Sequence, residues 1–353
     1  MRSLHVVSTD ARRGAETFAV DLVDGLRTAG HEAQVVALRA SGSTATHPIR
    51  VLGRSRRSLT TLGALRPAAA SVDVVVAHGS STLEACAVAL AGSGTPFVYR
   101  TIGDPSYWVT ARWRRRAIAA MLQRAARNVV LWPGAASEVA RLYRFPLDRV
   151  DVIPNAVPTH RFALKSHNSQ RLARQRLELP QSGPCLANVG ALSREKHVTA
   201  VIRAVGALPG VSLVVAGDGP DRCLLERLAA DVAPGRVRFL GSIDDPRDVY
   251  AAADLLILPS RSEGMPAVII EAGLVGTPTV ATRVGAIPEM LDDDVTGFLV
   301  PAGSPGPLAA RIKAALPRAL DAGTRARTSF MTRYGIEGVV PAWFETLTKA
   351  GQQ

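Results

Sequence analysis

Short apolar runs rich in Val, Ile and Leu alternate with longer amphipathic stretches from one end of the chain to the other. Runs of this length without polar alternation predict strands of a parallel sheet that is buried on both faces. In the first half, strands are predicted at 4–8, 33–38, 72–77, 97–100, 129–132 and 150–153, and helices at 15–29, 82–91, 112–127 and 135–142. Because parallel strands need crossover helices, this order predicts a doubly wound α/β domain.

A second series of the same kind begins near Pro184. Its strands are predicted at 185–189, 212–216, 237–240, 255–258 and 279–281, with helices starting near His197, Asp221, Arg247, Pro266 and Gly306. A chain of 353 residues is long enough for two domains with separate cores. We therefore predict an N-terminal domain over 1–157, a second domain over 184–334, and a polar connection over 158–183 with a helix near 169–177.

The chain is strongly basic. Its 42 Lys and Arg residues outnumber 30 Asp and Glu residues, which gives a net charge of +12, and only four of the cations are lysines. A basic balance favours anionic partners such as phosphates, nucleic acid or acidic lipid. A composition rich in Arg and Ala is also typical of GC-rich genes, and we assign most of the charge to that bias.

The cysteine and membrane patterns bear on the compartment. Cys86, Cys185 and Cys223 are far apart, in apolar surroundings and without metal-ligand spacing. We interpret them as reduced thiols of the core, which favours a cytoplasmic location. Residues 1–10 lack the apolar stretch of a signal peptide, and no run of about 18 apolar residues predicts a membrane span.

No metal site is predicted. The seven histidines show no ligand spacing. The acidic clusters 244–245 and 292–294 fall at turn signals, next to Pro246 and before Gly297, and we interpret both as solvated turns.

The most informative segment is 259–272. A buried strand ends there, a polar loop turns at Gly264, and Pro266 suits the first position of a helix. The start of that helix offers unpaired N–H groups and a positive dipole end, which favour a diphosphate. Glu263 precedes the helix and Glu271 follows within it, with seven residues between them.

This glutamate pair resembles the EX7E motif of retaining glycosyltransferases with the GT-B fold, in particular glycosyltransferase family 4. The resemblance implies two Rossmann-like, doubly wound parallel-sheet domains facing a cleft, with a C-terminal helix at 335–353 packing back across both. It implies that Glu263 holds the sugar hydroxyls and supports the positive centre, and that Glu271 holds the nucleotide ribose. The alternative interpretation is that Glu263 caps a helix and Glu271 is a surface residue.

Other segments of the second half support the resemblance. The loop from Gly190 to Lys196 resembles the family's donor-phosphate loop, and Lys196 matches its phosphate-binding lysine. Ala191 stands where many relatives carry an arginine, and Arg194 is a candidate to replace it. The turn at Gly217 resembles the family's G-x-G-P turn near the nucleotide base. The resemblance also assigns the donor to the helix start formed by Gly264, Met265 and Pro266.

The first half departs further from the family pattern. Gly14 follows the first strand and resembles the glycine-rich loop that approaches the donor diphosphate, although Arg13 replaces one glycine. After the 97–100 strand, many relatives have a histidine that lines the acceptor site. Asp104 is the nearest polar residue there and a catalytic candidate, with a simple turn aspartate as the equal alternative. His78 ends another strand and could line the cleft, but a lone histidine in such a place is more often a structural residue.

Aromatic residues and arginines cluster at 107–116, ahead of an apolar helix face. Tyr107, Trp108 and Trp113 beside Arg112, Arg114, Arg115 and Arg116 are typical of a helix that rests on anionic headgroups. An ordinary helix with a solvated basic face and Trp113 in the core is the alternative, and the sequence favours neither.

The resemblance implies a retaining hexosyltransferase that moves a sugar from a nucleotide diphosphate sugar to an acceptor hydroxyl in bacterial glycolipid, polysaccharide or glycoconjugate synthesis. It implies no cofactor, and the enzyme would be cytoplasmic, with a peripheral membrane position as an option. A nucleotide-sugar hydrolase or epimerase of the same fold is the first alternative. A basic nucleic-acid-binding protein is a distant one, because aromatics are only 5% and the arginines are spread throughout.

Overall fold

The chain forms two compact units in the computed structural model, which describes residues 1–42, 46–107, 111–303 and 305–352. The first unit consists of Met1–Val157 with Tyr334–Gln353, and the second of Pro158–Arg333. The stretch 158–183, expected as a connection, thus belongs to the second unit. The C-terminal segment belongs to the first.

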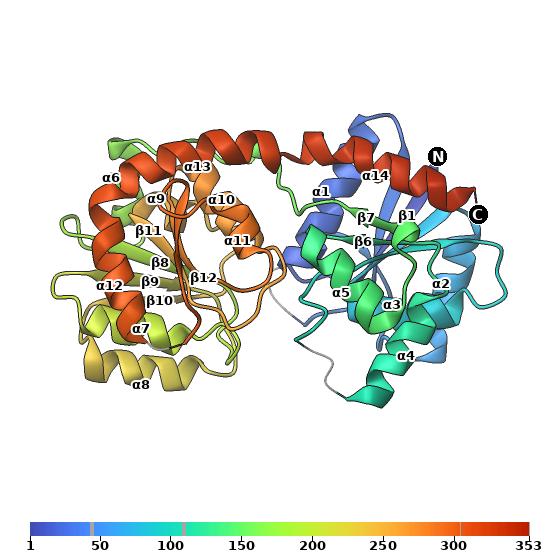
Figure 1. The fold of residues 1–353 in the computed structure, drawn as a ribbon, viewed down its shortest axis with the longest axis horizontal. Helices are drawn as coiled ribbons and strands as arrows, with labels where there is room; N and C mark the ends of the chain where they lie inside the picture. Colours follow the sequence, from blue (N-terminus) through green and yellow to red (C-terminus); the bar gives the residue numbers. More distant parts are fainter. Residues whose placement is uncertain (43–45, 108–110, 304, 353) are drawn as a thin grey trace. The chain divides into compact units, whose positions relative to one another are not determined.

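The first unit is built on a seven-stranded parallel sheet. The strands are β1 (Arg2–Thr9), β2 (Glu32–Arg39), β3 (Arg50–Gly53), β4 (Val74–His78), β5 (Phe97–Arg100), β6 (Arg127–Val130) and β7 (Val150–Val152), in the order β3-β2-β1-β4-β5-β6-β7. Two helices pack together on one face, α1 (Gly14–Thr28) and α14 (Ile336–Gly351). The others are α2 (Leu59–Ala70), α3 (Ser80–Ala89), α4 (Arg112–Leu122) and α5 (Pro133–Tyr143), which pack in sequence against one another (Figure 1).

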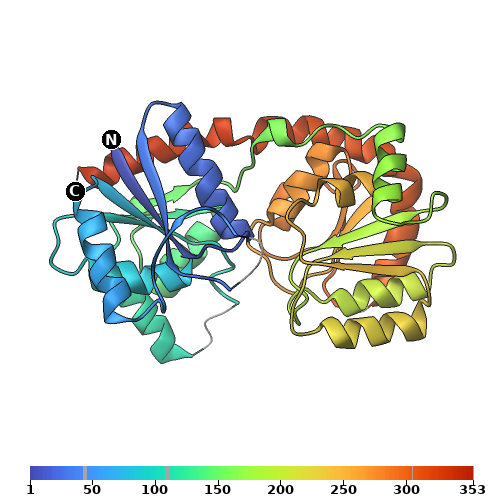
Figure 2. The same ribbon diagram turned by 180° about the vertical axis from the view of Figure 1, so that it is seen from behind.

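The second unit is built on a six-stranded parallel sheet. The strands are β8 (Cys185–Val189), β9 (Ser212–Ala216), β10 (Val237–Gly241), β11 (Leu255–Leu258), β12 (Thr279–Thr282) and β13 (Gly297–Val300), in the order β10-β9-β8-β11-β12-β13. The helices are α6 (His167–Arg176), α7 (Val198–Gly206), α8 (Arg222–Val232), α9 (Arg247–Ala252), α10 (Ala267–Val275), α11 (Ile287–Met290), α12 (Pro305–Ala315) and α13 (Ala319–Arg333). Figure 2 shows this sheet between two helical layers.

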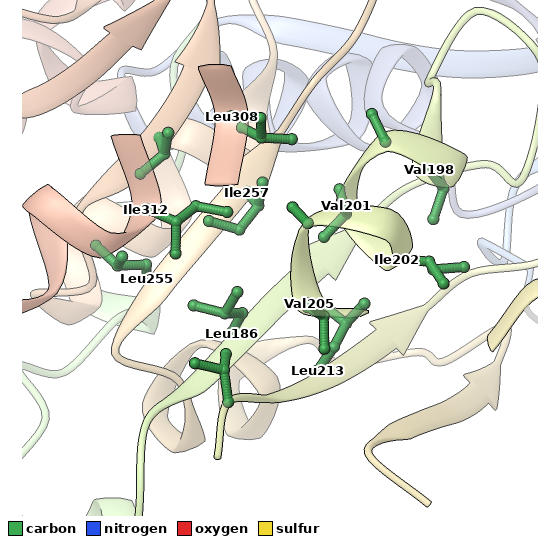
Figure 3. Close-up of a cluster of buried hydrophobic side chains, with 14 of the residues drawn as sticks. Leu186, Val198, Val201, Ile202, Val205, Leu213, Leu255, Ile257, Leu308 and Ile312 are labelled. Carbon is green, nitrogen blue, oxygen red and sulfur yellow. The ribbon is translucent and has the colours of Figure 1, made fainter. Parts of the chain in front are cut away.

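The core of the second unit explains why its strands are continuous apolar runs. Leu186, Leu213 and Ile257 project from neighbouring strands against Val201 of α7 and Ile312 of α12, and all five are fully buried (Figure 3). The apolar face of α7 therefore packs on the sheet, while α9 and α10 cover the opposite face. A strand covered on both faces has no polar side, as the sequence pattern indicated.

Helix α14 completes the core of the first unit. Ile336, Val340, Trp343 and Leu347 are buried together with Phe18 of α1 and with side chains of the sheet. Trp343 is 0% exposed. The apolar face of α14 is thus part of the hydrophobic core of the first unit.

The structure also contains elements that the sequence pattern did not predict. The strand β3 has no buried residue, and α2 contains Pro67, so neither presents a clear apolar period. The helix predicted at 112–127 ends at Leu122, and Arg127 starts β6, where it pairs with Asp151 at 2.5 Å. Of the three cysteines, Cys86 and Cys185 are buried as expected, but Cys223 is exposed on α8, which corrects its assignment to the core.

None of the helices in the described ranges combines the length and the apolar character that a membrane crossing requires.

Candidate active site

The candidate site lies where the strand order of the second sheet reverses. Strands β8 and β11 are parallel neighbours there, although β9 and β10 follow β8 in the chain. In open α/β sheets, ligands bind beyond the carboxyl ends of the strands at such a switch point. The two loops that leave β8 and β11 at this point are 190–197 and 259–266, which contain most of the predicted site residues.

Lys196 and Glu263 form the centre of the site. The Lys196 ammonium donates a hydrogen bond to the Glu263 carboxylate at 2.7 Å, and the Ser260 hydroxyl donates to the same oxygen at 2.6 Å. The side chain of Glu263 is 7% exposed and that of Lys196 is 25% exposed. A mostly buried carboxylate thus has a cation and a hydroxyl as partners, and the cation remains accessible to an anionic ligand.

The loops around this pair are bound to one another by main-chain hydrogen bonds. The Arg261 N–H donates to the Glu195 carbonyl at 2.8 Å, and the Ala286 N–H donates to the Gly264 carbonyl at 3.0 Å. The loops after β8, β11 and β12 therefore form one assembly. Such bonding fixes the positions of the side chains that the loops present.

Gly217 allows the loop after β9 to approach this assembly closely. It has φ +139°, and a Cβ there would lie 1.8 Å from the Gly190 carbonyl oxygen. The Leu192 N–H donates to the Asp218 carbonyl at 3.0 Å, which joins the same two loops. Gly217 is therefore required by the backbone, whatever its role toward a nucleotide.

Helix α10 begins beside Glu263. Its first residue is Ala267, and Pro266 occupies the cap position, one residue earlier than the sequence predicted. No side chain caps this end and no acidic residue lies in the first turn. Met265 is buried, while Arg194, in the loop after β8, is exposed. The helix start thus presents the positive end of its dipole beside Lys196 and Glu263.

Glu271 lies within α10 and is half-buried. The hydroxyl of Tyr250, on α9, donates to its Oε2 at 2.6 Å. Sequence reasoning did not identify Tyr250, because a buried tyrosine 21 residues away gives no local signal of its partner. The two glutamates of the motif thus have different partners, a cation for Glu263 and a phenol for Glu271.

The remaining candidates, Gly14 and Asp104, belong to the first unit. Gly14 starts α1, and a Cβ there would meet no atom within 4 Å. Asp104 Oδ1 accepts from the Ser106 N–H at 2.8 Å and from its hydroxyl at 2.7 Å, which is the geometry of a turn aspartate. His78 is buried against His5 and Trp343 and is a core residue.

The acidic cluster 292–294 lies in a partly exposed turn, as predicted, but two of its carboxylates are also held in ion pairs. Asp293 pairs with Arg283 at 2.5 Å and also with Arg311, while Asp294 pairs with Arg311 and Arg318. These ion pairs hold the turn before β13 against α12 and the segment after it. Across the described ranges, no group of three or more His, Cys, Asp or Glu residues has the arrangement of a metal site.

Two doubly wound parallel-sheet domains are the architecture of GT-B proteins, and this chain has that architecture, with the Lys196–Glu263 pair at the switch point of its second sheet. HepE of Anabaena, in a crystal structure with UDP-glucose, has this fold, with a TM-score of 0.88, 21% sequence identity and 99% coverage of both chains.

The sequence comparisons identify the family. Residues 12–161 match the family model described as Glycosyltransferase Family 4, and residues 183–317 match the model described as Glycosyl transferases group 1. The chain therefore belongs to glycosyltransferase family 4, which confirms the resemblance noted in its motifs.

Two curated relatives match parts of the chain. The lipopolysaccharide core biosynthesis glycosyltransferase LpsE of Rhizobium meliloti is 37% identical over 131 residues, which cover 37% of this chain and 38% of that protein. The D-inositol 3-phosphate glycosyltransferase of Mycobacterium bovis is 34% identical over 239 residues, or 64% of this chain and 46% of that protein. The matches thus span less than half the length of these relatives.

Proposed function

We propose that the protein is a retaining glycosyltransferase that moves a sugar from a nucleotide diphosphate sugar to an acceptor hydroxyl. The observation that carries the proposal is the Lys196–Glu263 pair at the switch point of the second sheet, 2.7 Å apart beside the start of α10. Phosphate groups bind well to a lysine and to a helix N-terminus, and a carboxylate suits sugar hydroxyls.

The proposed reaction develops charge of both signs. The bond between the anomeric carbon and the diphosphate oxygen breaks, and a bond from the acceptor oxygen forms on the same face of the sugar. Negative charge then grows on the diphosphate, where Lys196 and the N-terminus of α10 stabilise it. Glu263 holds the sugar hydroxyls and stabilises the positive anomeric centre. The acceptor's proton passes to an oxygen of the departing diphosphate.

The residues around the pair would bind the donor. Glu271 holds the ribose, while Gly190, Arg194 and Gly217 line the diphosphate and the base. The donor also contacts the start of α10, at Gly264, Met265 and Pro266. We propose no metal or other cofactor, so turnover should be the same with and without EDTA.

A donor panel tests this proposal. UDP-, GDP- and ADP-sugars are screened by thermal shift, and the donor that binds is incubated with glycolipid and saccharide acceptors. We expect a product that keeps the donor's anomeric configuration by NMR, and at least about a hundredfold loss of kcat in Glu263→Gln. Glu345→Gln, an exposed glutamate of α14 paired with Lys349, is the matched control.

Other outcomes would contradict the proposal in different ways. Release of free sugar at the same rate with and without an acceptor would favour the hydrolase. A change in the sugar's configuration without transfer would favour the epimerase. An inverted product, or normal turnover in Glu263→Gln, would exclude the mechanism proposed above.

We also propose that α4 brings the enzyme to an anionic membrane or a lipid-linked acceptor, as a peripheral protein of the cytoplasmic face. Trp113 is 68% exposed, which excludes its assignment to the core, and Tyr107 is 41% exposed. Arg112, Arg114 and Arg116 are exposed around Trp113. Trp108 and the two residues after it lie outside the described residues. Among the α4 residues, all of them described, only Leu122 is buried.

Vesicle flotation tests the membrane proposal. The wild type should float with vesicles that contain phosphatidylglycerol and not with neutral ones, and Arg112→Gln/Arg114→Gln/Arg116→Gln should lose the binding. Arg171→Gln/Arg203→Gln/Arg227→Gln removes the same charge from exposed positions of the second unit and should float normally. If both triple variants lose binding to the same extent, net charge and not the position of α4 accounts for the binding.

A further inference from the structure

We propose that Tyr250 is a positioning residue for the nucleotide ribose, acting through Glu271. The inference rests on the proposed function, in which the Glu271 carboxylate binds the ribose hydroxyls. It adds a residue of α9 to the donor site and gives its hydroxyl a role that can be measured separately from folding.

The contact between the two side chains is short. The Tyr250 hydroxyl lies 2.6 Å from Glu271 Oε2, within the usual range for a hydrogen bond between a hydroxyl and a carboxylate. Tyr250 is 0% exposed, whereas Glu271 is half-buried on α10. The phenol therefore reaches the carboxylate from the interior of the second unit, and the carboxylate lies nearer the surface.

The direction of this hydrogen bond is fixed by chemistry. Burial, followed by the negative charge of Glu271, raises the pKa of Tyr250 well above its usual range. The phenol therefore keeps its proton at physiological pH, and an ionised carboxylate can only accept. Tyr250 is thus the donor and Glu271 the acceptor.

The main chain at Tyr250 is held as firmly as its side chain. The Thr277 hydroxyl donates to the Tyr250 carbonyl at 2.7 Å. The Lys165 ammonium in turn donates to Thr277 Oγ1 at 2.8 Å and to the Ala253 carbonyl at 2.6 Å, and Arg174 Nε donates to the Ala252 carbonyl at 2.9 Å. The segment 158–183 thereby fixes the C-terminal end of α9, so the phenol has a rigid base.

A fixed carboxylate suits a ribose better than a mobile one. A carboxylate has two oxygens and about four lone-pair positions, so it can accept from Tyr250 and from a vicinal diol together. A glutamate side chain that is already oriented loses less rotamer freedom when it binds. Because the ribose does not react, its contacts should be equally strong in the ground state and the transition state. Loss of these contacts should therefore raise KM and leave kcat unchanged.

A purely structural role makes a different prediction. A buried phenol needs a hydrogen-bond partner, and Glu271 supplies one whether or not it binds a nucleotide. In that case, removal of the hydroxyl should weaken all ligands equally or none. A positioning role instead ties the loss of affinity to the ribose hydroxyls.

The experiment compares a ribonucleotide and its dideoxy counterpart on wild type, on one variant and on one control variant. Wild type and Tyr250→Phe, which keeps the ring and its packing, are titrated calorimetrically with UDP, GDP and ADP. The nucleotide that binds most tightly is then compared with its 2′,3′-dideoxy counterpart. Tyr99→Phe makes the same chemical change at a buried tyrosine of the first unit and serves as the control.

We expect Tyr250→Phe to weaken the ribonucleotide about five- to tenfold and the dideoxynucleotide less than twofold, with a matching rise in donor KM and kcat within about twofold. Equal losses for both ligands, or a loss in kcat alone, would overturn the positioning role. If wild type itself binds both ligands equally, Glu271 does not hold the ribose, and the ribose assignment of the proposed function fails first. If no nucleotide binds, the proposed function fails as a whole.

Discussion

Lys196 and Glu263 are 67 residues apart in the chain, and their charged groups lie 2.7 Å apart in the second unit. One follows β8 and the other follows β11, which are neighbours only because the strand order of the sheet reverses between them. The topology thus creates the ion pair, and it places the pair where a doubly wound sheet binds its ligand.

This pair should show measurable coupling in stability. Lys196→Met removes the cation from a carboxylate that is 7% exposed, so the free energy of unfolding of the second unit should fall by about 1–3 kcal/mol. Lys196→Met/Glu263→Gln should lose less than the sum of the single variants, because the double variant buries no unpaired charge. Urea unfolding followed by circular dichroism measures these differences. Strictly additive losses would show that the pair is not coupled.

Two glycines of the predicted donor loops should respond differently to a methyl group. Gly217→Ala places a Cβ 1.8 Å from the Gly190 carbonyl oxygen at φ +139°, so the melting temperature of the second unit should fall clearly. Gly14→Ala meets no atom within 4 Å and should leave the melting temperature unchanged. If the Gly14 backbone approaches the diphosphate, as the family resemblance implies, Gly14→Ala should still weaken donor binding. Unchanged binding would remove Gly14 from the donor site.

The first unit should lose stability in acid through its buried histidines. Burial, with help from the charge of Arg100, lowers the pKa of His5 from 6.5 to about 3. Below pH 6.5 the unfolded chain binds a proton there that the folded unit does not, so the free energy of unfolding falls as the pH drops from 6.5 toward 3. The contribution approaches about 1.4 kcal/mol per pH unit.

Tryptophan fluorescence can follow this transition, because the sequence of the second unit, Pro158–Arg333, contains no tryptophan. Urea titrations at pH 7, 6, 5 and 4 should give a shallower loss of stability in His5→Gln than in wild type. Carboxylates that titrate in the same range are common to both proteins and cancel in the comparison. If the free energy of unfolding falls equally steeply with pH in the two proteins, His5 is not the source of the acid sensitivity.

The second unit should gain stability in mild alkali through Lys165. Burial lowers the pKa of this lysine from 10.5 to about 8, although two hydrogen bonds hold its ammonium. Between these values the unfolded chain binds the extra proton, so the free energy of unfolding rises with pH by up to about 3 kcal/mol. Lys165→Met should abolish this rise in circular-dichroism urea titrations. A rise of the same size in Lys165→Met would assign it to another group.

The sequence predicted most of the strands and helices because each is a local pattern. Strands covered on both faces must be continuous apolar runs, and Leu255–Leu258 shows this plainly. The same locality explains the omissions. The strand Arg50–Gly53 lies at an edge with no buried residue, and the helix Leu59–Ala70 contains a proline, so neither has a clear period.

The candidate site was predictable in part for the same reason. Glu263, Glu271 and Lys196 sit in loops and a helix that follow buried strands, so the sequence located them without any tertiary contact. The partners of these residues were not predictable. Ser260 is near Glu263 in the chain, but Tyr250 reaches Glu271 from another helix, and only the packing of α9 on α10 brings them within 2.6 Å.

Local pattern thus determined the elements and the residues at their ends, because hydrophobic periodicity and turn chemistry are properties of neighbouring residues. Tertiary structure decided which ends meet and which polar groups become partners. It paired Lys196 with Glu263, exposed Cys223 and Trp113, and bound Asp293 and Asp294 to arginines of the same unit. These outcomes depend on strand order and helix packing, which join residues far apart in the sequence and leave no periodic trace in it.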